Sequence, residues 1–294
     1  MNRRDWLKKL PLAAAGAMFP AAVTQPLPGK PRLRTAVCAY SFRDELAKGT
    51  MTYDDLIRLA ADLGVDGLDL TVYWLPQNPT NEYLFSLRRL AFRYGIDIYS
   101  IGTRVQMCQP TPELREAETR RLAQWLSVAE RLGARHMRVF GAAAPKGATE
   151  EQVVTWVSET LKQCAPIAGA RGILLGLEDD GGVTDIAERL VQMVKGADSP
   201  WAGINLDLGN FKTDAYRQIE TCLPYATNIH AKSAVHENNG QPMAPDWDRI
   251  FRMIAPVYRG YLSVEYEGAA PPRTAVPELV AKLQSMVRKY APAG

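Results

Sequence analysis

The sequence predicts a single-domain α/β protein, a (β/α)₈ TIM barrel over residues 33–292. Four stretches repeat one theme, in which a helical pattern is followed by a glycine and then by a β-rich run. The β-rich runs are short and mostly apolar, as strands covered on both faces are. Extended along the chain, the theme gives eight β-then-α units. Such alternation forms a parallel sheet, and eight units can close it into a barrel.

The apolar residues before each glycine keep helical spacing, and the runs after it have the length of strands. Four glycines stand where a helix ends with a left-handed residue: Gly64, Gly95, Gly133 and Gly172. Strands are expected near residues 35–40, 66–72, 96–101, 135–140, 173–178, 203–207, 227–231 and 261–265. Helices are expected near residues 52–63, 82–94, 112–132, 149–169, 183–196, 214–223, 246–255 and 275–290.

A doubly wound open sheet is the alternative arrangement of the same units. Such sheets often bind dinucleotides through a glycine-rich turn after the first strand. The corresponding stretch here, AVCAYSFRDE, contains no glycine. The closed barrel is therefore the better prediction.

Residues 1–27 do not belong to this core and are interpreted as an export signal with a linker. Basic residues open the segment, an apolar run from Leu10 to Val23 follows, and then comes TQPLPGKP. This pattern is typical of an export leader, and the run is shorter than the ~20 apolar residues of a membrane span. RRDWLKK resembles a twin-arginine signal, with Trp6 where Phe is usual. We expect this segment to direct the protein to the periplasm. The alternative is that residues 1–27 are a disordered basic tail.

Loss of the leader makes the remaining chain neutral. Residues 1–26 hold four of the 35 basic and one of the 32 acidic residues, so 31 of each remain. A neutral chain lacks the basic surface that binds nucleic acid, and no membrane partner is expected after the signal is removed. The four cysteines form no CxxC pair, which argues against a zinc finger or a thioredoxin-type site. We interpret them as small buried side chains.

The last four predicted strands end in side chains of metal-ligand type: Glu178, Asp207, His230 and Glu265. Chemistry in such barrels collects at the carboxyl ends of the strands, so four neighbouring strands would direct these side chains to one point. Buried carboxylates without a partner are unfavourable, and one divalent metal ion would compensate them. Oxygen-rich ligation with one nitrogen suits Mn²⁺ best, with Mg²⁺, Co²⁺, Fe²⁺ and Zn²⁺ as the other candidates.

At these four residues the sequence resembles the xylose isomerase-like TIM barrels, the sugar phosphate isomerase and epimerase superfamily, over about residues 33–290. GLEDDGGVTDIAERL is similar to the fifth strand of the family and the Gly-Gly loop after it. LDLGNF is similar to its Asp strand, and IHAKS and VEYEG are similar to its His and Glu strands. The resemblance implies that Glu178, Asp207, His230 and Glu265 bind one metal ion, and that the two glutamates also transfer protons.

Two positions depart from the family pattern and concern the substrate. Asn210 stands where epimerases of the family often carry a histidine, and Ser233 follows Lys232 where an acidic residue is common. Lys232 is a candidate catalytic donor to a developing oxyanion, with a solvated loop lysine as the alternative. Asn210, Arg104 and Tyr40 are candidate substrate-binding residues. For Tyr40, the alternative to substrate binding is packing in the core.

These residues predict a metal-dependent isomerase or epimerase that acts on a sugar or keto-sugar through an enediolate. A metal that holds a carbonyl and the adjacent hydroxyl acidifies the C–H bond between them. Carboxylates on opposite faces can then remove the proton and return it. Export favours a free sugar, a 3-keto-sugar or a glycoside over a sugar phosphate. On a 3-keto-glycoside the same site would suit a lyase that works by β-elimination.

Two other classes of function are alternatives for a barrel of this kind. A DNA-repair nuclease would need a cluster of zinc ions, and three histidines with a neutral surface supply neither its ligands nor phosphate affinity. A secreted barrel that binds sugars without catalysis remains the second alternative. The expected partner is a small sugar molecule, and a homo-oligomer is compatible with the sequence.

Overall fold

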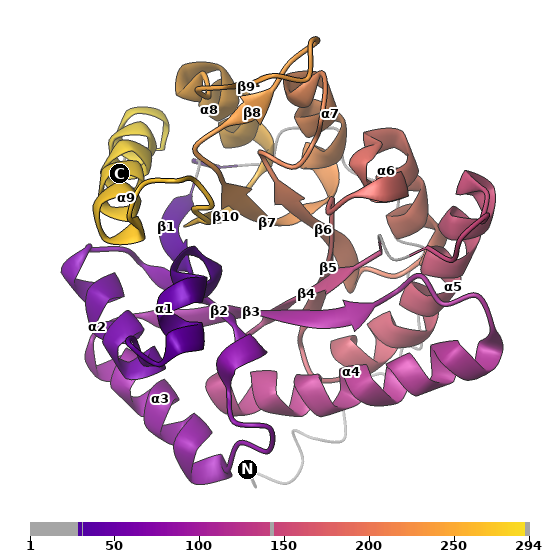
Figure 1. Ribbon diagram of the computed structural model, residues 1–294, viewed down its shortest axis with the longest axis horizontal. Helices are drawn as coiled ribbons and strands as arrows, with labels where there is room; N and C mark the ends of the chain where they lie inside the picture. Colours follow the sequence, from indigo (N-terminus) through magenta and orange to yellow (C-terminus); the bar gives the residue numbers. More distant parts are fainter. Residues whose placement is uncertain (1–28, 31, 142–143, 292–294) are drawn as a thin grey trace, which may run out of the picture.

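The computed structural model describes residues 29–30, 32–141 and 144–291. Eight parallel strands form a closed barrel in the order β1-β10-β7-β6-β5-β4-β3-β2, and the helices surround it (Figure 1). The (β/α)₈ barrel predicted from the sequence is confirmed. The strands are β1 (Leu33–Cys38), β2 (Gly67–Thr71), β3 (Asp97–Gln106), β4 (His136–Phe140), β5 (Leu174–Glu178), β6 (Ala202–Asp207), β7 (Ala226–Ala231) and β10 (Gly260–Val264).

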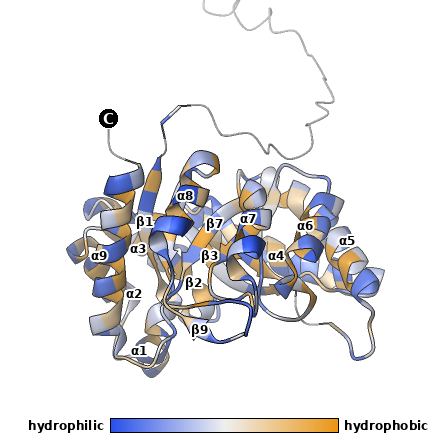
Figure 2. Ribbon diagram, turned by 90° about the horizontal axis from the view of Figure 1, so that it is seen from above, coloured by the Kyte–Doolittle hydropathy of each residue, from blue (hydrophilic) through white to orange (hydrophobic). Residues whose placement is uncertain are grey.

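The helices lie outside the barrel and carry both hydrophilic and hydrophobic residues (Figure 2). They are α1 (Arg43–Lys48), α2 (Tyr53–Asp62), α3 (Asn81–Arg93), α4 (Pro112–Leu132), α5 (Glu150–Gly169), α6 (Ala187–Gly196), α7 (Ala215–Cys222), α8 (Trp247–Val257) and α9 (Pro272–Tyr290). Among the described residues, no helix has the length and apolar character needed to cross a membrane. The export signal proposed for residues 1–27 lies outside the described residues.

Local sequence sets where the helices begin and end. Thr52, Thr80, Thr111 and Thr149 each accept a backbone N–H bond at the start of a helix, and such a cap stabilises a helix by about 1 kcal/mol. The four glycines predicted at helix ends have φ values between 65° and 86°. The left-handed conformation expected for them is therefore confirmed.

The barrel has an apolar outer layer and a polar interior. Strand residues such as Leu70, Leu177 and Leu206 are fully buried in the hydrophobic core. Asp69 on β2 and Asn228 on β7 are buried and hydrogen-bonded to each other. Because β2 and β7 are not neighbours in the barrel, this bond crosses its interior, where branched apolar residues usually pack.

Several short elements were not predicted. Residues between β1 and α2 form a 3-10 helix, η2 (Ala39–Phe42), followed by α1, and β3 continues to Gln106, beyond its predicted end at residue 101. The helix expected near residues 183–196 is divided into a 3-10 helix, η4 (Gly182–Asp185), and α6, which begins at Ala187. The unpredicted β8 (Val235–His236) pairs with β9 (Pro242–Met243) as an antiparallel hairpin. Tertiary contacts fix such segments: Ser41 Oγ in η2 donates to the Val264 carbonyl (3.0 Å).

Candidate metal centre

The structure brings the four predicted ligands together at the carboxyl ends of four neighbouring strands. Glu178 and Asp207 end β5 and β6, His230 lies in β7, and Glu265 follows β10. Asp207 is paired in register with His230. One ligand atom from each of the four side chains lies within 4.8 Å of the others.

The charges of this cluster fit a divalent cation. His230 Nδ1 lies 3.1 Å from Glu178 Oε1 and 3.2 Å from Glu265 Oε2. Asp207 is fully buried, and its Oδ2 has the Lys232 ammonium as an ionic partner at 3.1 Å. Three buried carboxylates that converge on one point are unfavourable unless positive charge compensates them, so this donor set suits a divalent cation. The ligand atoms are three carboxylate oxygens and one imidazole nitrogen, which Mn²⁺ and similar ions accept.

Lys232 joins the cluster as a buried ammonium group. It is 8% exposed, so it is not a solvated loop lysine. Its Nζ lies 2.7 Å from Glu265 Oε2 and 3.1 Å from Asp207 Oδ2, and it also contacts the Glu267 carboxylate. Burial alone would lower the pKa of Lys232, but these carboxylates raise it well above its ordinary value. Burial alone would raise the pKa of Glu265, but Lys232 and His230 hold it well below its usual range.

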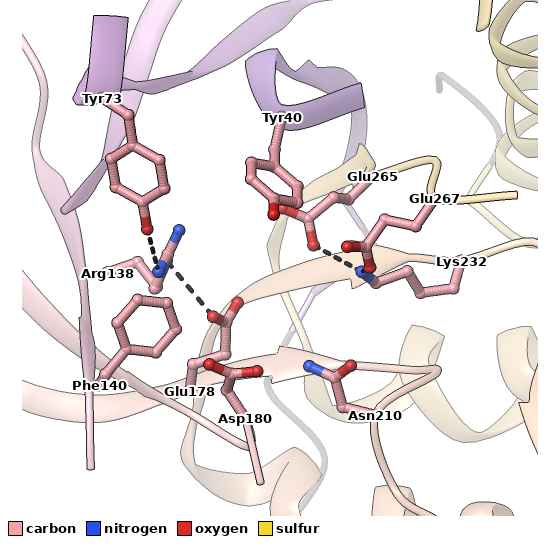
Figure 3. A pocket seen from close by; sticks show the side chains of 10 residues that line it. All are labelled: Tyr40, Tyr73, Arg138, Phe140, Glu178, Asp180, Asn210, Lys232, Glu265 and Glu267. Atoms are coloured by element: carbon pink, nitrogen blue, oxygen red, sulfur yellow. Dashed lines mark hydrogen bonds and ion pairs between the residues drawn. The ribbon is translucent and has the colours of Figure 1, made fainter. Parts of the chain in front are cut away.

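A cavity of about 140 Å³ adjoins the cluster (Figure 3). Among its lining residues are the predicted metal ligands Glu178 and Glu265 and three other predicted site residues, Tyr40, Asn210 and Lys232. The rest of the lining consists of Tyr73, Arg138, Phe140, Asp180 and Glu267. Arg104, the other predicted substrate-binding residue, is not among the lining residues. It is exposed, and its guanidinium group lies 4.1 Å from the centre of the Tyr73 ring.

Arg138 on β4 is a site residue that the sequence analysis missed. It is 3% exposed, and its Nε lies 3.4 Å from Glu178 Oε2. Its NH1 donates to the Tyr73 hydroxyl (3.0 Å), and its guanidinium group lies 4.0 Å from the centre of the Phe140 ring. Burial would lower the pKa of Arg138, but Glu178 and Tyr73 raise it. A charged residue between the apolar residues of the run MRVF was the signal that could have revealed it.

Two aspartates after β5 were also missed. Asp180 lines the cavity, and desolvation together with the negative charge of Glu178 raises its pKa to about 6. Asp179 is fully buried, and its Oδ1 accepts a bond from the backbone N–H of Asp207 (2.7 Å). Burial and the charge of Asp207 raise the pKa of Asp179 well above its ordinary value. Asp179 thus fixes the backbone of one candidate ligand, while Asp180 faces the space that a substrate would occupy.

The chain matches a known protein family in sequence and several solved proteins in structure. The family model described as "Xylose isomerase-like TIM barrel" matches residues 57–286. No curated protein sequence matches the chain. D-psicose 3-epimerase from Clostridium cellulolyticum H10 is similar in structure, with a TM-score of 0.68, 16% identity, and coverage of 89% of this chain and 100% of that one.

Two further solved structures share the fold. One is 3-keto-D-glucoside 4-epimerase from E. coli, with a TM-score of 0.66, 14% identity, and coverage of 87% of this chain and 100% of that one. The other is a probable 3-DHS dehydratase from Bacillus anthracis, with a TM-score of 0.68, 14% identity, and coverage of 85% of this chain and 98% of that one. At these identities the likeness establishes the fold alone.

Proposed function

The chain belongs to the xylose isomerase-like TIM barrel family, and from this membership and the geometry of the cluster we propose that it is a divalent-metal-dependent sugar isomerase or epimerase. The observation that carries the proposal is the convergence of Glu178, Asp207, His230 and Glu265 to within 4.8 Å beside a cavity of about 140 Å³. Buried titratable groups that converge at a concave pocket are the usual sign of an active site.

These four side chains would hold the metal ion, and Mn²⁺ suits their oxygen-rich donor set best. When bound, such an ion polarises a sugar carbonyl and the neighbouring hydroxyl, which acidifies the C–H bond next to the carbonyl. Glu178 and Glu265 come from β5 and the end of β10, which are separated in the barrel by β6 and β7. We therefore assign them to removal and return of the proton from two directions.

The two buried cations have a complementary role. Lys232 and Arg138 line the cavity and keep their charges, because neighbouring carboxylates raise the pKa of each. They can donate hydrogen bonds to a substrate oxygen on which negative charge develops when the carbon loses its proton. Asn210 and Tyr40 supply neutral polar groups for sugar hydroxyls, and Arg104 borders the site through Tyr73.

The charge of the cavity favours an uncharged sugar over a sugar phosphate. Arg138 and Lys232 are its only lining cations among the described residues, and both are already paired with carboxylates. Asp180 and Glu267 add negative charge to the lining, which would repel a phosphate group. Two of the epimerases that share this fold are named for uncharged sugars, D-psicose and a 3-keto-D-glucoside. We propose a free sugar or keto-sugar as substrate.

A lyase is the second candidate function, because the same site could act on a 3-keto-glycoside. Proton removal beside the ketone would then be followed by loss of the β-substituent. Asp180, with a pKa raised to about 6, is suited to protonate a leaving oxygen near neutral pH. A probable dehydratase shares the fold. A sugar-binding barrel without catalysis would keep the cavity but transfer no proton.

Deuterium exchange tests the proposal. We would incubate the Mn²⁺-loaded chain with uncharged ketoses and 3-keto-glycosides in D₂O, and follow both carbon-bound deuterium and aglycone release by NMR. We expect exchange with wild type, none with Glu265→Gln, and wild-type exchange with Glu278→Gln, which alters an exposed carboxylate on α9. Exchange without release supports the isomerase or epimerase, and release supports the lyase. Binding of a sugar with neither reaction would refute catalysis.

We further propose that the chain is exported to the periplasm, on the basis of the twin-arginine-type pattern in residues 1–27. Periplasmic location agrees with an uncharged substrate, because free sugars and glycosides reach that compartment. Cell fractionation with a Lys–Lys replacement of Arg3 and Arg4 as the control would test it. Cytoplasmic retention of the unaltered chain would refute export.

A further inference from the structure

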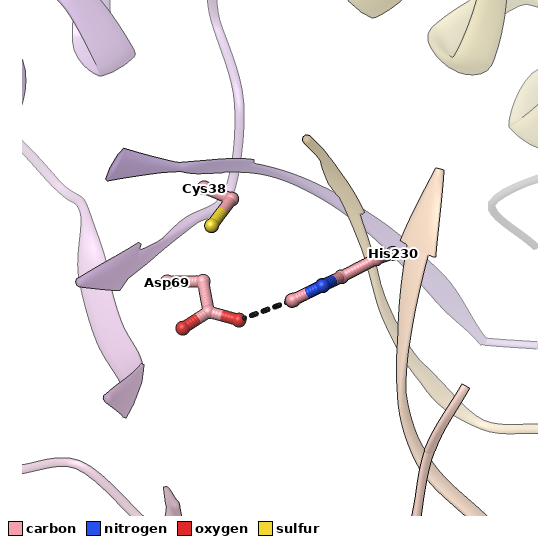
Figure 4. Close-up of side chains that lie close together, drawn as sticks. All are labelled: Cys38, Asp69 and His230. Carbon is pink, nitrogen blue, oxygen red and sulfur yellow. Dashed lines mark hydrogen bonds and ion pairs between the residues drawn. The ribbon is translucent and has the colours of Figure 1, made fainter. Parts of the chain in front are cut away.

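The His230 ring uses its two nitrogens for different purposes. Nδ1 faces the carboxylates of the metal cluster. Nε2 bonds to Asp69 Oδ2 on β2 at a distance of 2.9 Å (Figure 4). An ionised carboxylate only accepts hydrogen bonds, so the hydrogen of this bond belongs to Nε2. A histidine that binds a metal does so as the neutral ring, whose lone pair would then lie on Nδ1, the atom that points toward the other candidate ligands.

Asp69 also reaches a second metal ligand through two buried amides. Asn228 Nδ2 donates to Asp69 Oδ2 (3.0 Å) and to Asn205 Oδ1 (2.8 Å). Asn205 Nδ2 in turn donates to Glu178 Oε1 (2.8 Å). Asp69 is 1% exposed, and both amides are 0% exposed. One carboxylate is therefore connected to His230 directly and to Glu178 by a chain of hydrogen bonds.

A hydrogen bond from Tyr99 fixes the orientation of the Asn228 amide in this series of hydrogen bonds. The Tyr99 hydroxyl donates to Asn228 Oδ1 (2.9 Å), which turns the amide nitrogen of Asn228 toward Asp69. Tyr99 itself stacks on Tyr261, with ring centres 3.8 Å apart. The hydrogen-bonded network is therefore joined to a packed aromatic pair. Its side chains cannot rotate without breaking several buried hydrogen bonds.

Asp69 and His230 also form a group with Cys38, whose atoms lie within 4.8 Å of one another. We interpret this group as side chains that orient the metal ligands, and not as a second cation site. Asp69 Oδ2 already accepts two hydrogen bonds, from His230 and from Asn228. Cys38 Sγ lies in hydrogen-bond contact with Glu265 Oε1 (3.2 Å). The trio is thus linked to the metal cluster through His230 and through the contact of Cys38 with Glu265.

We propose that Asp69 is a positioning residue for the metal centre, and that it acts through His230 directly and through Asn228 and Asn205 on Glu178. The inference rests on the proposed metal site. Histidines that bind metals generally donate their other ring N–H to a carboxylate or carbonyl, which fixes the tautomer and orientation of the ring. Loss of such a partner usually weakens metal affinity by about 10–100-fold.

Calorimetric titration of the metal-free full chain with Mn²⁺ tests the proposal. We expect Asp69→Ala to weaken binding by about 10–100-fold. Asp69→Asn should weaken it less, because an amide oxygen can still accept from Nε2. The visible spectrum of the Co²⁺-loaded chain should also change in both variants, since it reports the geometry of the ligands. The control is Ser100→Ala, which removes the buried partner of another histidine, His136, at 2.9 Å. This control should bind Mn²⁺ as wild type does.

Circular dichroism would establish that each variant is folded. If Asp69→Ala does not fold, the Mn²⁺ affinity and the Co²⁺ spectrum of Asp69→Asn test the inference. Wild-type Mn²⁺ affinity and an unchanged Co²⁺ spectrum in the folded variants would overturn the inference alone. Failure of the wild-type chain to bind any divalent cation would instead refute the metal site, and the proposed function with it.

Discussion

Lys232→Met removes the positive charge that the chain itself places among its buried carboxylates. Lys232 Nζ lies 2.7 Å from Glu265 Oε2 and 3.1 Å from Asp207 Oδ2. Methionine fills a similar space without charge. Removal of one partner from a buried ion pair costs about 3–5 kcal/mol. In a domain of this size, that loss corresponds to a fall in Tm of roughly 10 °C for the metal-free variant.

A divalent cation should reverse much of this loss. It would supply positive charge to the same carboxylates, and in the variant no ammonium group repels it. Two unit charges 4 Å apart interact by about 4 kcal/mol at the effective dielectric constant of a protein surface. The electrostatic difference between the two chains is therefore large enough to measure. We expect Mn²⁺ to raise the Tm of Lys232→Met by more than it raises the Tm of wild type.

Thermal denaturation of both chains, after chelation and with saturating Mn²⁺, provides the assay. Lys289→Met is the control, because Lys289 pairs with Asp248 at the surface and is 59% exposed. Exposed pairs of this kind contribute little, so this variant should follow wild type in both states. A metal-free Lys232→Met as stable as wild type would refute the reasoning. So would a Mn²⁺-induced increase in Tm no larger than that of wild type.

The same pair predicts the pH range of the effect. The pKa of Glu265 is lowered in the folded chain, so its stabilising contribution is present above its ordinary value of 4.5 and is lost as the pH falls through the folded-state pKa. The pKa of Lys232 is raised, so its contribution is present below 10.5 and is lost at higher pH. The difference in Tm between wild type and Lys232→Met should therefore be full between pH 4.5 and 10.5 and shrink outside that range.

Three further substitutions test other parts of the structure. Arg138→Met leaves Glu178 buried with one cation fewer and should cost about 3–5 kcal/mol in urea denaturation; wild-type stability would contradict this. Asp180 has a raised pKa of about 6, so the folded chain holds its proton more tightly than the unfolded chain does. The Tm of wild type should therefore fall relative to Asp180→Asn as the pH rises from 3.8 to about 6, and a constant difference would count against it. In Gly176→Ala the added Cβ would lie 2.4 Å from His136 Nε2, so we expect a loss of about 1–3 kcal/mol by overpacking, which an unchanged denaturation midpoint would disprove.

The barrel and its four candidate ligands could be predicted because they depend on local and periodic signals. Helix ends are marked by glycines such as Gly133, which has φ 86°. Strand ends are marked by single acids or a histidine in apolar runs. Once the units alternate, parallel strands must bring their carboxyl ends to one edge of the barrel. The convergence of Asp207 and His230 then follows from topology alone.

The supporting residues could not be placed in the same way. Asn205 faces Glu178 because the two are paired in register on β5 and β6, and the sequence does not give that register. Asp69 meets His230 across the interior of the barrel, between strands that are not neighbours. The sequence around Lys232 is compatible with a solvated or a functional lysine, and only the tertiary structure buries this side chain. The short helices between β1 and α2 likewise depend on contacts with the end of β10.

The number of manganese ions bound per chain is the most direct test of whether strands β5, β6, β7 and β10 bring their ligands to one ion. The chain would be stripped with chelator, equilibrated with Mn²⁺, freed of excess ion, and assayed for bound manganese per chain by mass spectrometry. We expect one ion per chain in wild type and in the surface control Glu278→Gln, and loss of that ion in Asp207→Asn. A wild-type chain that retains no manganese, or an Asp207→Asn variant that retains as much as wild type, would contradict it.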